Sequence, residues 1–441
     1  MELKHTIAVL AFIVALPGGV LATVPPAPPT AASSAPTAAE LRALKAAMAA
    51  DAGKSAARPP VTNAPRPSVA PANGGGATAL GGAAGMASYR AQSMVGAMNP
   101  DISLILDVAG GWFSVDKPMQ TGAHDPSRTG FTLQQLEMHV FSAVDPYFQM
   151  EANIVFAEFG VEVEEAYARS MALPAGLQLR AGQFLVRMGR LNPTHPHSWA
   201  FADQPLVNGK LLGSEGLRGL GTELSWLTPL PWFAEVVVST QMAGGACCAR
   251  SFGGGNAQPV QTPFDLMQLV RLQQFFPLDT DWSVTWGLSA AVGPNPSGAG
   301  RLGSNRTDIF ATDLYVRYRP VASRVRAALS WETEAMLRRR QVPGRLLSDW
   351  GVNSQLVWRY ALRWEAGVRG EYVTGVVDDP LDPQWSGDRQ RTTVQWTFYP
   401  SHFSRLRLQG SIDRPAWRSK PVYAAFVAME VVIGAHGSHG F

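Results

Sequence analysis

The sequence predicts an all-β fold: a transmembrane antiparallel β-barrel of about 16 strands, preceded by a disordered N-terminal arm that carries one short helix. Two observations lead to this prediction. From Asp101 onward apolar and polar residues alternate in segments of roughly barrel-strand length, and the connections between these segments are short and long in turn. Composition agrees, because the 441 residues include 43 Gly and 13 Trp while only 16% are charged, against about 25% in soluble domains.

Residues 1–22 have the pattern of an export signal. Lys4 and His5 form a short polar start, an apolar run extends from Thr6 to Leu16, and small residues surround Ala22. We expect cleavage after Ala22. The apolar run is too short to span a membrane as a helix, which needs about 18 or more residues.

Residues 23–95 are dominated by Ala, Pro, Ser and Gly and cannot bury enough apolar surface to fold alone. Within this periplasmic arm a short helix is predicted over residues 37–52, because Thr37 precedes Leu41, Leu44 and Met48 at helical spacing. The arm is either a plain tether or a coiled-coil arm that joins protomers or touches the cell wall.

Residues 96–441 are expected to form the barrel. Alternation is clearest where Gln149, Glu151 and Asn153 share one face of a segment and Phe148 and Met150 share the other. Sixteen segments can be marked in this way. They begin near residues 101, 130, 146, 161, 176, 216, 231, 262, 280, 306, 324, 346, 361, 390, 403 and 421.

The connections distinguish a membrane barrel from a soluble sandwich. Short turns such as Asp145-Pro146 and Tyr360-Ala361 follow the even-numbered segments. Longer loops, such as 187–215, 243–261 and 374–389, follow nearly all odd-numbered ones, the connection near Phe159-Gly160 being the one expected exception. This parity predicts an even strand number and both termini on the periplasmic side of the outer membrane of a Gram-negative bacterium.

Aromatic residues near the segment ends support a position in a lipid bilayer. They are Trp226, Trp232, Trp282, Trp331, Trp350, Trp364 and Tyr399. The last segment presents Tyr423, Val427 and Met429 on one side, and the chain ends in Phe441. An amphipathic strand closed by a terminal Phe resembles the signal that the barrel-assembly machinery reads, so this machinery is an expected partner.

Two family resemblances follow from local motifs. The stretch Leu179–Phe184, which contains Gly182-Gln183-Phe184, resembles the Gly-Gln-Phe strand of the phosphate-selective porin O and P family. The closer resemblance is to a group of porin-like proteins often labelled zinc-regulated TonB-dependent outer membrane receptors. It is carried by Asn99–Ser103, by His195-Pro196-His197-Ser198-Trp199 with Asp203–Leu206, and by Ile433–His436.

The resemblances imply a porin whose loop after the Gly-Gln-Phe strand folds inward, here from Arg187 to Glu215, and homotrimers are an expectation from the porins it resembles. The receptor part of the second label does not fit the size of the chain. Such transporters have about 22 strands around a plugged lumen, whereas only about 340 residues follow Asn99.

Charge decides how selective such a pore would be. Beyond residue 95 the chain has 30 Lys and Arg against 31 Asp and Glu, so the totals predict a weakly selective pore unless local rings of charge set a preference. The residues expected at the constriction are Arg180, Arg187, Arg190, Glu137, Glu151, Arg363 and Arg369. Further candidates are Arg324, Arg326, Arg405, Arg407, Glu162, Glu164 and Glu365.

No cofactor is expected, with the exception of a zinc ion held by His195, His197 and Asp203, because imidazoles plus a carboxylate suit a borderline metal. The alternative is that these side chains pin the loop to the wall. Arg338-Arg339-Arg340 is predicted to lie in the loop after segment 11, as a solvated loop by default, with lipopolysaccharide phosphate as the partner favoured over a protein or nucleic acid. The adjacent Cys247 and Cys248 read as a loop with a vicinal disulfide or two thiols.

Enzymatic signatures such as a Gly-x-Ser-x-Gly elbow or a His-Glu-x-x-His pair do not occur in the sequence, so no enzyme, no catalytic residue and no nucleic-acid partner is expected. The predicted function is passive, weakly selective diffusion of small hydrophilic solutes or ions across the outer membrane. One alternative is a metal- or phosphate-specific channel with a binding site in loop 187–215. The other is a closed barrel that anchors the periplasmic arm.

Overall fold

A computed structural model describes residues 100–434 with the exception of 159, 243–247, 254–259, 261, 298–304, 322–326 and 380–381. The expected signal peptide, the arm with its helix at 37–52, Arg324, Arg326 and Phe441 lie outside the described residues, and the expectations for them stay predictions.

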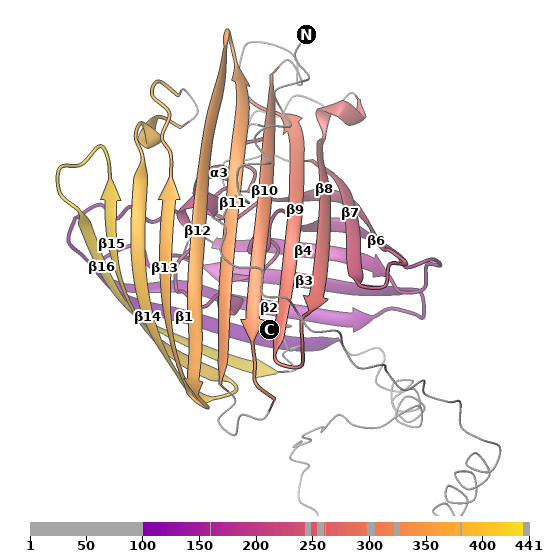
Figure 1. The fold of residues 1–441 in the computed structure, drawn as a ribbon, viewed down its shortest axis with the longest axis horizontal. Helices are drawn as coiled ribbons and strands as arrows, with labels where there is room; N and C mark the ends of the chain where they lie inside the picture. Colours follow the sequence, from indigo (N-terminus) through magenta and orange to yellow (C-terminus); the bar gives the residue numbers. More distant parts are fainter. Residues whose placement is uncertain are drawn as a thin grey trace, which may run out of the picture. The chain divides into compact units, whose positions relative to one another are not determined.

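Sixteen antiparallel strands form one closed barrel in which each strand pairs with its neighbours in sequence and β1 closes against β16 (Figure 1). The predicted fold class is therefore confirmed. The strands are β1 (Asp101–Phe113), β2 (Gly130–Ala143), β3 (Phe148–Ala157), β4 (Gly160–Ser170), β5 (Leu177–Leu185), β6 (Arg218–Leu227), β7 (Phe233–Met242), β8 (Met267–Pro277), β9 (Trp282–Pro294), β10 (Arg306–Tyr318), β11 (Ala328–Val342), β12 (Arg345–Ala361), β13 (Trp364–Val373), β14 (Arg389–Ser401), β15 (Ser404–Pro415) and β16 (Val422–Gly434).

Alternation along each strand separates an outer from an inner face, because successive side chains point to opposite sides. In β16, Tyr423, Val427 and Met429 are exposed, whereas the intervening Phe426 and Ala428 are buried inside. The same pattern in the other strands gives the barrel an exposed apolar outer surface, of which Leu220, Val270, Leu356, Val394 and Leu408 are examples. Such a surface is typical of strands that face lipid.

The tryptophans expected near the bilayer boundary are exposed on this outer surface, from Trp282 at 38% to Trp350 at 45% of their area. Tyr399 differs from the prediction. Its position in β14 belongs to the inner face, where the Arg359 guanidinium lies over the ring at 4.7 Å from its centroid. The sequence alone does not determine on which face Tyr399 lies, because a shift of one position along a strand moves a side chain to the opposite face.

The connection between β11 and β12 corrects two expectations. It is a tight turn at Pro343-Gly344 rather than a long loop, and β11 continues through Val342. Arg338 and Arg340 are therefore inner-face strand residues, both almost fully buried. Arg338 pairs with Asp349 and Asp382, and Arg340 pairs with Asp379. Internal carboxylates, and not external phosphate, neutralise these two arginines.

Loop 3, which we define as residues 186–217 between β5 and β6, lies inside the barrel. It contains the short helices η1 (Pro196–Ser198) and α3 (Leu206–Leu211), and α3 contacts β11, β12 and β13. Apolar residues of loop 3, such as Leu206 and Leu212, form one buried cluster with inner-face residues of the wall, such as Ile309 and Met336. Part of the barrel interior is therefore a packed apolar core.

Within the described part of the chain, the other short helices are η2 (Pro263–Asp265) and η3 (Pro383–Trp385). Among the described residues, no helix has the length and apolarity to cross a membrane.

The outer surface generates a first prediction. Val394, at the middle of β14, is 57% exposed. Replacing it by Arg is expected to lower the free energy of unfolding in lipid vesicles by about 2–4 kcal/mol, because a charge near the bilayer midplane loses its hydration. Denaturant titration of the vesicle-folded protein measures this difference. Val321→Arg, at an exposed turn residue, is the control, and equal stability of both variants would contradict a lipid-facing β14.

Candidate functional site: loop 3 across the barrel interior

Loop 3 lies between two inner walls of opposite charge. The acidic wall consists of Glu137 of β2 with Glu164 and Glu165 of β4, all buried. The arginine wall comes from β13 to β15 and consists of Arg369, Arg391, Arg405 and Arg407, also buried. Buried charges are tolerated only when they are paired and hydrogen-bonded, and the loop supplies much of that pairing for both walls.

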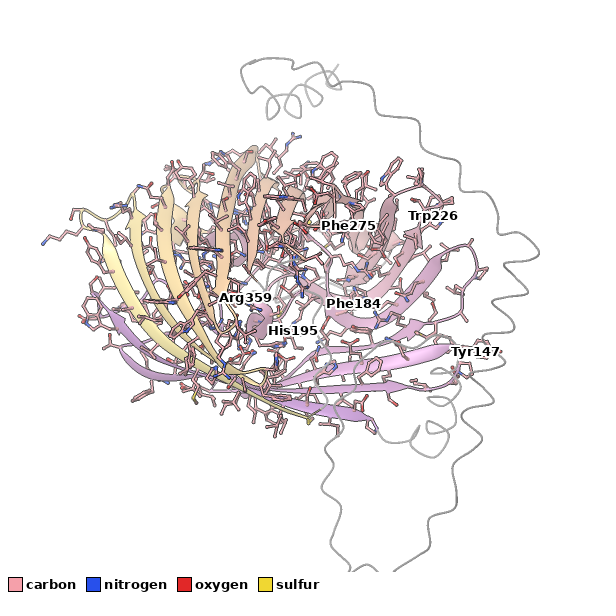
Figure 2. All side chains as sticks on the ribbon, turned by 60° about the horizontal axis from the view of Figure 1, so that its bottom comes forward. Tyr147, Phe184, His195, Trp226, Phe275 and Arg359 are labelled. Atoms are coloured by element: carbon pink, nitrogen blue, oxygen red, sulfur yellow. The ribbon has the colours of Figure 1, made fainter. Side chains whose placement is uncertain are left out.

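The imidazoles of loop 3 bind the acidic wall. His195 Nδ1 lies 3.0 Å from a Glu164 oxygen and its Nε2 lies 2.9 Å from a Glu165 oxygen. His197 Nδ1 lies 2.9 Å from Glu137, and the two rings stack with centroids 5.6 Å apart. Figure 2 shows His195 inside the ring of strands. The sequence alternative in which the histidines pin the loop to the wall agrees with these contacts.

Two β-bulges position the acidic wall. The pairing of β3 with β4 shifts after Asn153, so that Glu164 is the extra residue and both Glu164 and Glu165 are buried inside. The pairing of β1 with β2 shifts after Asp107, and both Gln134 and Gln135 are buried. Bulges redirect side chains in this way and are frequent next to functional sites.

Asp203 of loop 3 joins the arginine wall. One of its oxygens lies 2.7 Å from an Arg369 nitrogen, and the other lies 3.1 Å from Arg391. Both guanidiniums also contact the Glu371 carboxylate, at 3.0 and 2.7 Å. Glu371 in turn accepts a hydrogen bond from the Leu206 amide at the start of α3. Two cations and two anions thus form a closed network that fixes the middle of the loop.

Backbone groups of loop 3 complete the attachment to the arginine wall. Arg407 donates to the Trp199 and Phe201 carbonyls at 3.2 and 3.1 Å, and Arg405 donates to the Trp199 carbonyl at 2.9 Å. Hydrogen bonds between charged side chains and backbone groups are about twice as strong as neutral ones. They also satisfy the polar backbone of a loop that lies away from bulk water.

Glu334 of β11 fixes the beginning of the loop. Its carboxylate accepts hydrogen bonds from the Arg190 and Leu191 amides at 2.7 and 3.1 Å and from the Asn208 side chain at 3.3 Å. One wall residue thereby holds two separate parts of loop 3.

The pKa values of two loop histidines, His195 and His124, are raised. Burial lowers the pKa of His195, but the charges of Glu137 and Glu164 outweigh this effect and raise the pKa well above its usual value. For His124 of loop 1, which we define as residues 114–129, burial also lowers the pKa, while the contact with Glu215 raises it to about 9. At neutral pH the protonated imidazoles offset the buried carboxylates.

Most residues expected at the constriction point inward, although they belong to different clusters. Arg180 and Arg187 both pair with Glu223, at 2.8 and 3.2 Å. Arg190 lies 3.5 Å from Glu332, and Glu151 lies 3.6 Å from Arg169. Arg363 is separate from all of these, because it is exposed in the two-residue turn between β12 and β13.

The three expected metal ligands are divided between the two walls. His195 and His197 contact acidic residues, whereas Asp203 is held by Arg369 and Arg391. Among the described residues, the groups whose geometry could hold a metal ion have other members. They are His124 with Glu164 and Glu215, and His195 with Glu137 and Glu164.

Several residues that determine this site were absent from the sequence-based expectations. Glu334, Glu371 and Arg391 are inner-face residues of long alternating strands, and nothing in their local sequence identifies a loop as their partner. The adjacent Glu164-Glu165 pair does interrupt the alternation of β4, and this interruption is a signal from which the bulge could have been predicted.

Taken together, the barrel and its inward loop have the architecture of an outer-membrane porin. No known family model matches the chain. The chain is 30% identical over 385 residues to an uncharacterized protein of Aquifex aeolicus (strain VF5), a match that covers 78% of this chain and 80% of that protein. The chain belongs to the same family as that protein.

Solved structures with a similar fold are outer-membrane porins. A high-pH structure of Pseudomonas putida OprB has a TM-score of 0.50 at 10% sequence identity, over 79% of this chain and 97% of that one. An anion-selective porin from Comamonas acidovorans has a TM-score of 0.49 at 10% identity, over 76% and 99% of the two chains. At 10% identity the similarity to OprB shows a shared fold and nothing more. The similarity to the Comamonas porin supports no further conclusion.

The network around Asp203 generates a second prediction. Asp203→Asn is expected to lower the free energy of unfolding by about 3–5 kcal/mol, because it removes one partner of a buried charge network. Denaturant titration monitored by far-UV circular dichroism measures the change. Asp116→Asn, at an exposed residue of loop 1, is the matched control. A loss below about 1 kcal/mol, as for surface pairs, would contradict the described network.

Proposed function

We propose that this protein is a porin of the Gram-negative outer membrane that allows passive diffusion of small hydrophilic solutes or ions past loop 3. The observation that carries the proposal is the attachment of one inward loop to two oppositely charged inner walls of a closed 16-stranded barrel. A loop held in this way narrows the path through the barrel and places fixed charges on both sides of it.

The charges that loop 3 leaves partly exposed support weak selectivity. Arg169 pairs with Glu151, Arg187 with Glu235 and Arg359 with Glu365, and each of these side chains keeps between 10% and 32% of its area exposed. Both signs therefore occur along the inner surface. A lumen of mixed charge attracts neither cations nor anions strongly, in contrast to a ring of a single sign.

Single-channel conductance in planar bilayers tests the proposal. The purified protein is expected to insert as discrete open steps, and the reversal potential in a KCl gradient is expected to be small because the wall charges are mixed. A large reversal potential of either sign would contradict weak selectivity. Repeating the measurement with phosphate and with Zn²⁺ distinguishes a general pore from the metal- or phosphate-specific channel that the sequence resemblances imply.

Arg407→Met tests the part played by loop 3. Without the hydrogen bonds of Arg407 to the Trp199 and Phe201 carbonyls, the loop is held less firmly. Conductance is therefore expected to rise or to fluctuate between levels. The control is Arg418→Met, at an exposed residue of the connection between β15 and β16. Identical single-channel traces for Arg407→Met and wild type would show that the loop does not control the path.

A second candidate function is favoured by the apolar cluster inside the barrel, in which Leu206, Leu212 and Trp385 pack with wall residues. Such a core suits a closed barrel that anchors the N-terminal arm. Correctly folded protein that stays silent in bilayers would support this function and contradict the porin.

A further inference from the structure

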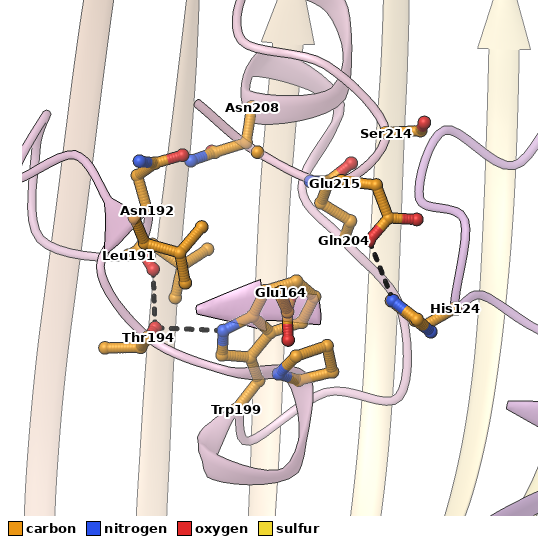
Figure 3. A pocket seen from close by; sticks show the side chains of 13 residues that line it. His124, Glu164, Leu191, Asn192, Thr194, Trp199, Gln204, Asn208, Ser214 and Glu215 are labelled. Atoms are coloured by element: carbon orange, nitrogen blue, oxygen red, sulfur yellow. Dashed lines mark hydrogen bonds and ion pairs between the residues drawn. The ribbon is translucent and has the colours of Figure 1, made fainter. Parts of the chain in front are cut away.

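A small cavity lies beside the acidic wall, where loop 1, β4 and loop 3 meet. Its volume is about 20 Å³, and its lining includes His124, Glu164, Glu215, Gln204 and Asn208 (Figure 3). A cavity of about 10–15 Å³ is enough for one water molecule, so a single ion can also be accommodated. The three titratable residues are each less than 8% exposed.

The three titratable side chains have the geometry of metal ligands. The ligand atoms of His124, Glu164 and Glu215 all lie within 4.8 Å of one another. Around a zinc ion with bonds of about 2.0–2.2 Å, tetrahedral ligand atoms are about 3.4 Å apart. Closing the group around an ion therefore needs movements on the order of 1 Å, which side-chain rotation provides.

The surroundings of His124 fix its orientation as a ligand. Its Nδ1 lies 3.0 Å from the Gln134 carbonyl oxygen, on the bulge of β2, and its Nε2 lies 2.9 Å from Glu215 (Figure 3). When Nδ1 donates to the carbonyl and the ring is neutral, the lone pair of Nε2 is directed toward the two carboxylates. Metal-bound histidines usually donate the hydrogen of their other ring nitrogen to a carboxylate or a backbone carbonyl, as Nδ1 of His124 would do here with Gln134.

Two further oxygens of the cavity lining have no hydrogen-bond partner among the described residues. They are Gln204 Oε1 and Asn208 Oδ1, from side chains that are 4% and 3% exposed. Most buried polar atoms are satisfied, so each exception needs an explanation. An amide oxygen or a water molecule can supply the fourth position of a tetrahedral ion.

Charge favours a cation at this place. Four buried carboxylates gather around the cavity and the adjacent second group, with three imidazoles between them; they are Glu137, Glu164, Glu165 and Glu215, and His124, His195 and His197. Within these seven groups the carboxylates outnumber the imidazoles, so a negative charge is left even when every imidazole is protonated, and unpaired buried charge is costly. A divalent ion removes this cost.

We propose that His124, Glu164 and Glu215 form a binding site for a divalent transition-metal ion such as Zn²⁺, which ties loop 1 and loop 3 to β4. The mixture of an imidazole with carboxylates suits a borderline metal better than Ca²⁺ or Mg²⁺, which take oxygen ligands. This site differs from the His195, His197 and Asp203 set expected from the sequence, and it does not depend on whether the barrel conducts.

Zinc binding to the full-length protein tests the proposal. The protein is purified in detergent without an affinity tag, freed of metal with a chelator, and titrated with Zn²⁺ by calorimetry. The background is His436→Gln with His439→Gln, which removes the histidine pair near the C-terminus. We expect one Zn²⁺ per chain and a raised unfolding temperature, because an ion that binds only the folded state stabilises it. No binding in this background would overturn the proposal.

Variants assign the ligands. Glu215→Gln and His124→Gln are expected to abolish stoichiometric binding, whereas the controls Glu158→Gln and His402→Gln, at exposed residues, keep it. Binding that survives in Glu215→Gln but is lost in Glu137→Gln would place the ion in the group of Glu137, Glu164 and His195 and contradict the assignment. Circular dichroism of each variant shows whether the barrel is folded.

X-ray absorption of the zinc-loaded wild-type protein gives a test that needs no variant. Nitrogen and oxygen ligands at about 2.0–2.2 Å, with the scattering pattern of one imidazole, are expected. A sulfur ligand at about 2.3 Å would place the ion at the Cys247-Cys248 pair and overturn the proposal.

Discussion

The ion pairs between loop 3 and the two inner walls are the constraint on which the interior depends. The loop presents imidazoles to Glu137, Glu164 and Glu165, and it presents Asp203 and several carbonyls to the arginines on the other side. The acidic wall takes its imidazole partners from the loop, and the arginine wall takes one of its carboxylates, Asp203, from the loop and others, such as Glu371 and Glu430, from its own strands. Unpaired buried charges cost several kcal/mol each, so the loop position and the wall charges require one another.

The strand architecture prepares this arrangement at specific positions. The bulge of β4 turns two adjacent carboxylates inward. Next to it, Gly182 of β5 has a φ of +140°, and a Cβ there would lie 2.2 Å from the Ala166 carbonyl oxygen. Only glycine permits this approach between β4 and β5. The glycine of the Gly-Gln-Phe motif therefore allows β5 to pack closely against β4 just before the chain leaves the barrel wall and enters loop 3.

Much of the fold could be predicted from the sequence, because each strand alternates between a lipid-facing and an inner face. The predicted strand starts are close to the observed ones, the largest difference being 262 against Met267. Both β11 and β12 were predicted, but the tight turn between them was not, because Arg338-Arg339-Arg340 reads as a solvated loop until Asp349 and Asp382 are seen beside it. Partners such as Glu371 and Arg391 could not be assigned, because the path of a loop across a barrel has no local sequence signal.

Amide hydrogen exchange of loop 3 in the folded protein tests the central claim most directly. The amides of Leu191, Ala202 and Leu206 donate to side chains of Glu334, Gln409 and Glu371 in the wall. Their exchange is expected to be as slow as that of the barrel strands. Exchange as fast as in the exposed turn 278–281 would show that loop 3 is not fixed between the two walls.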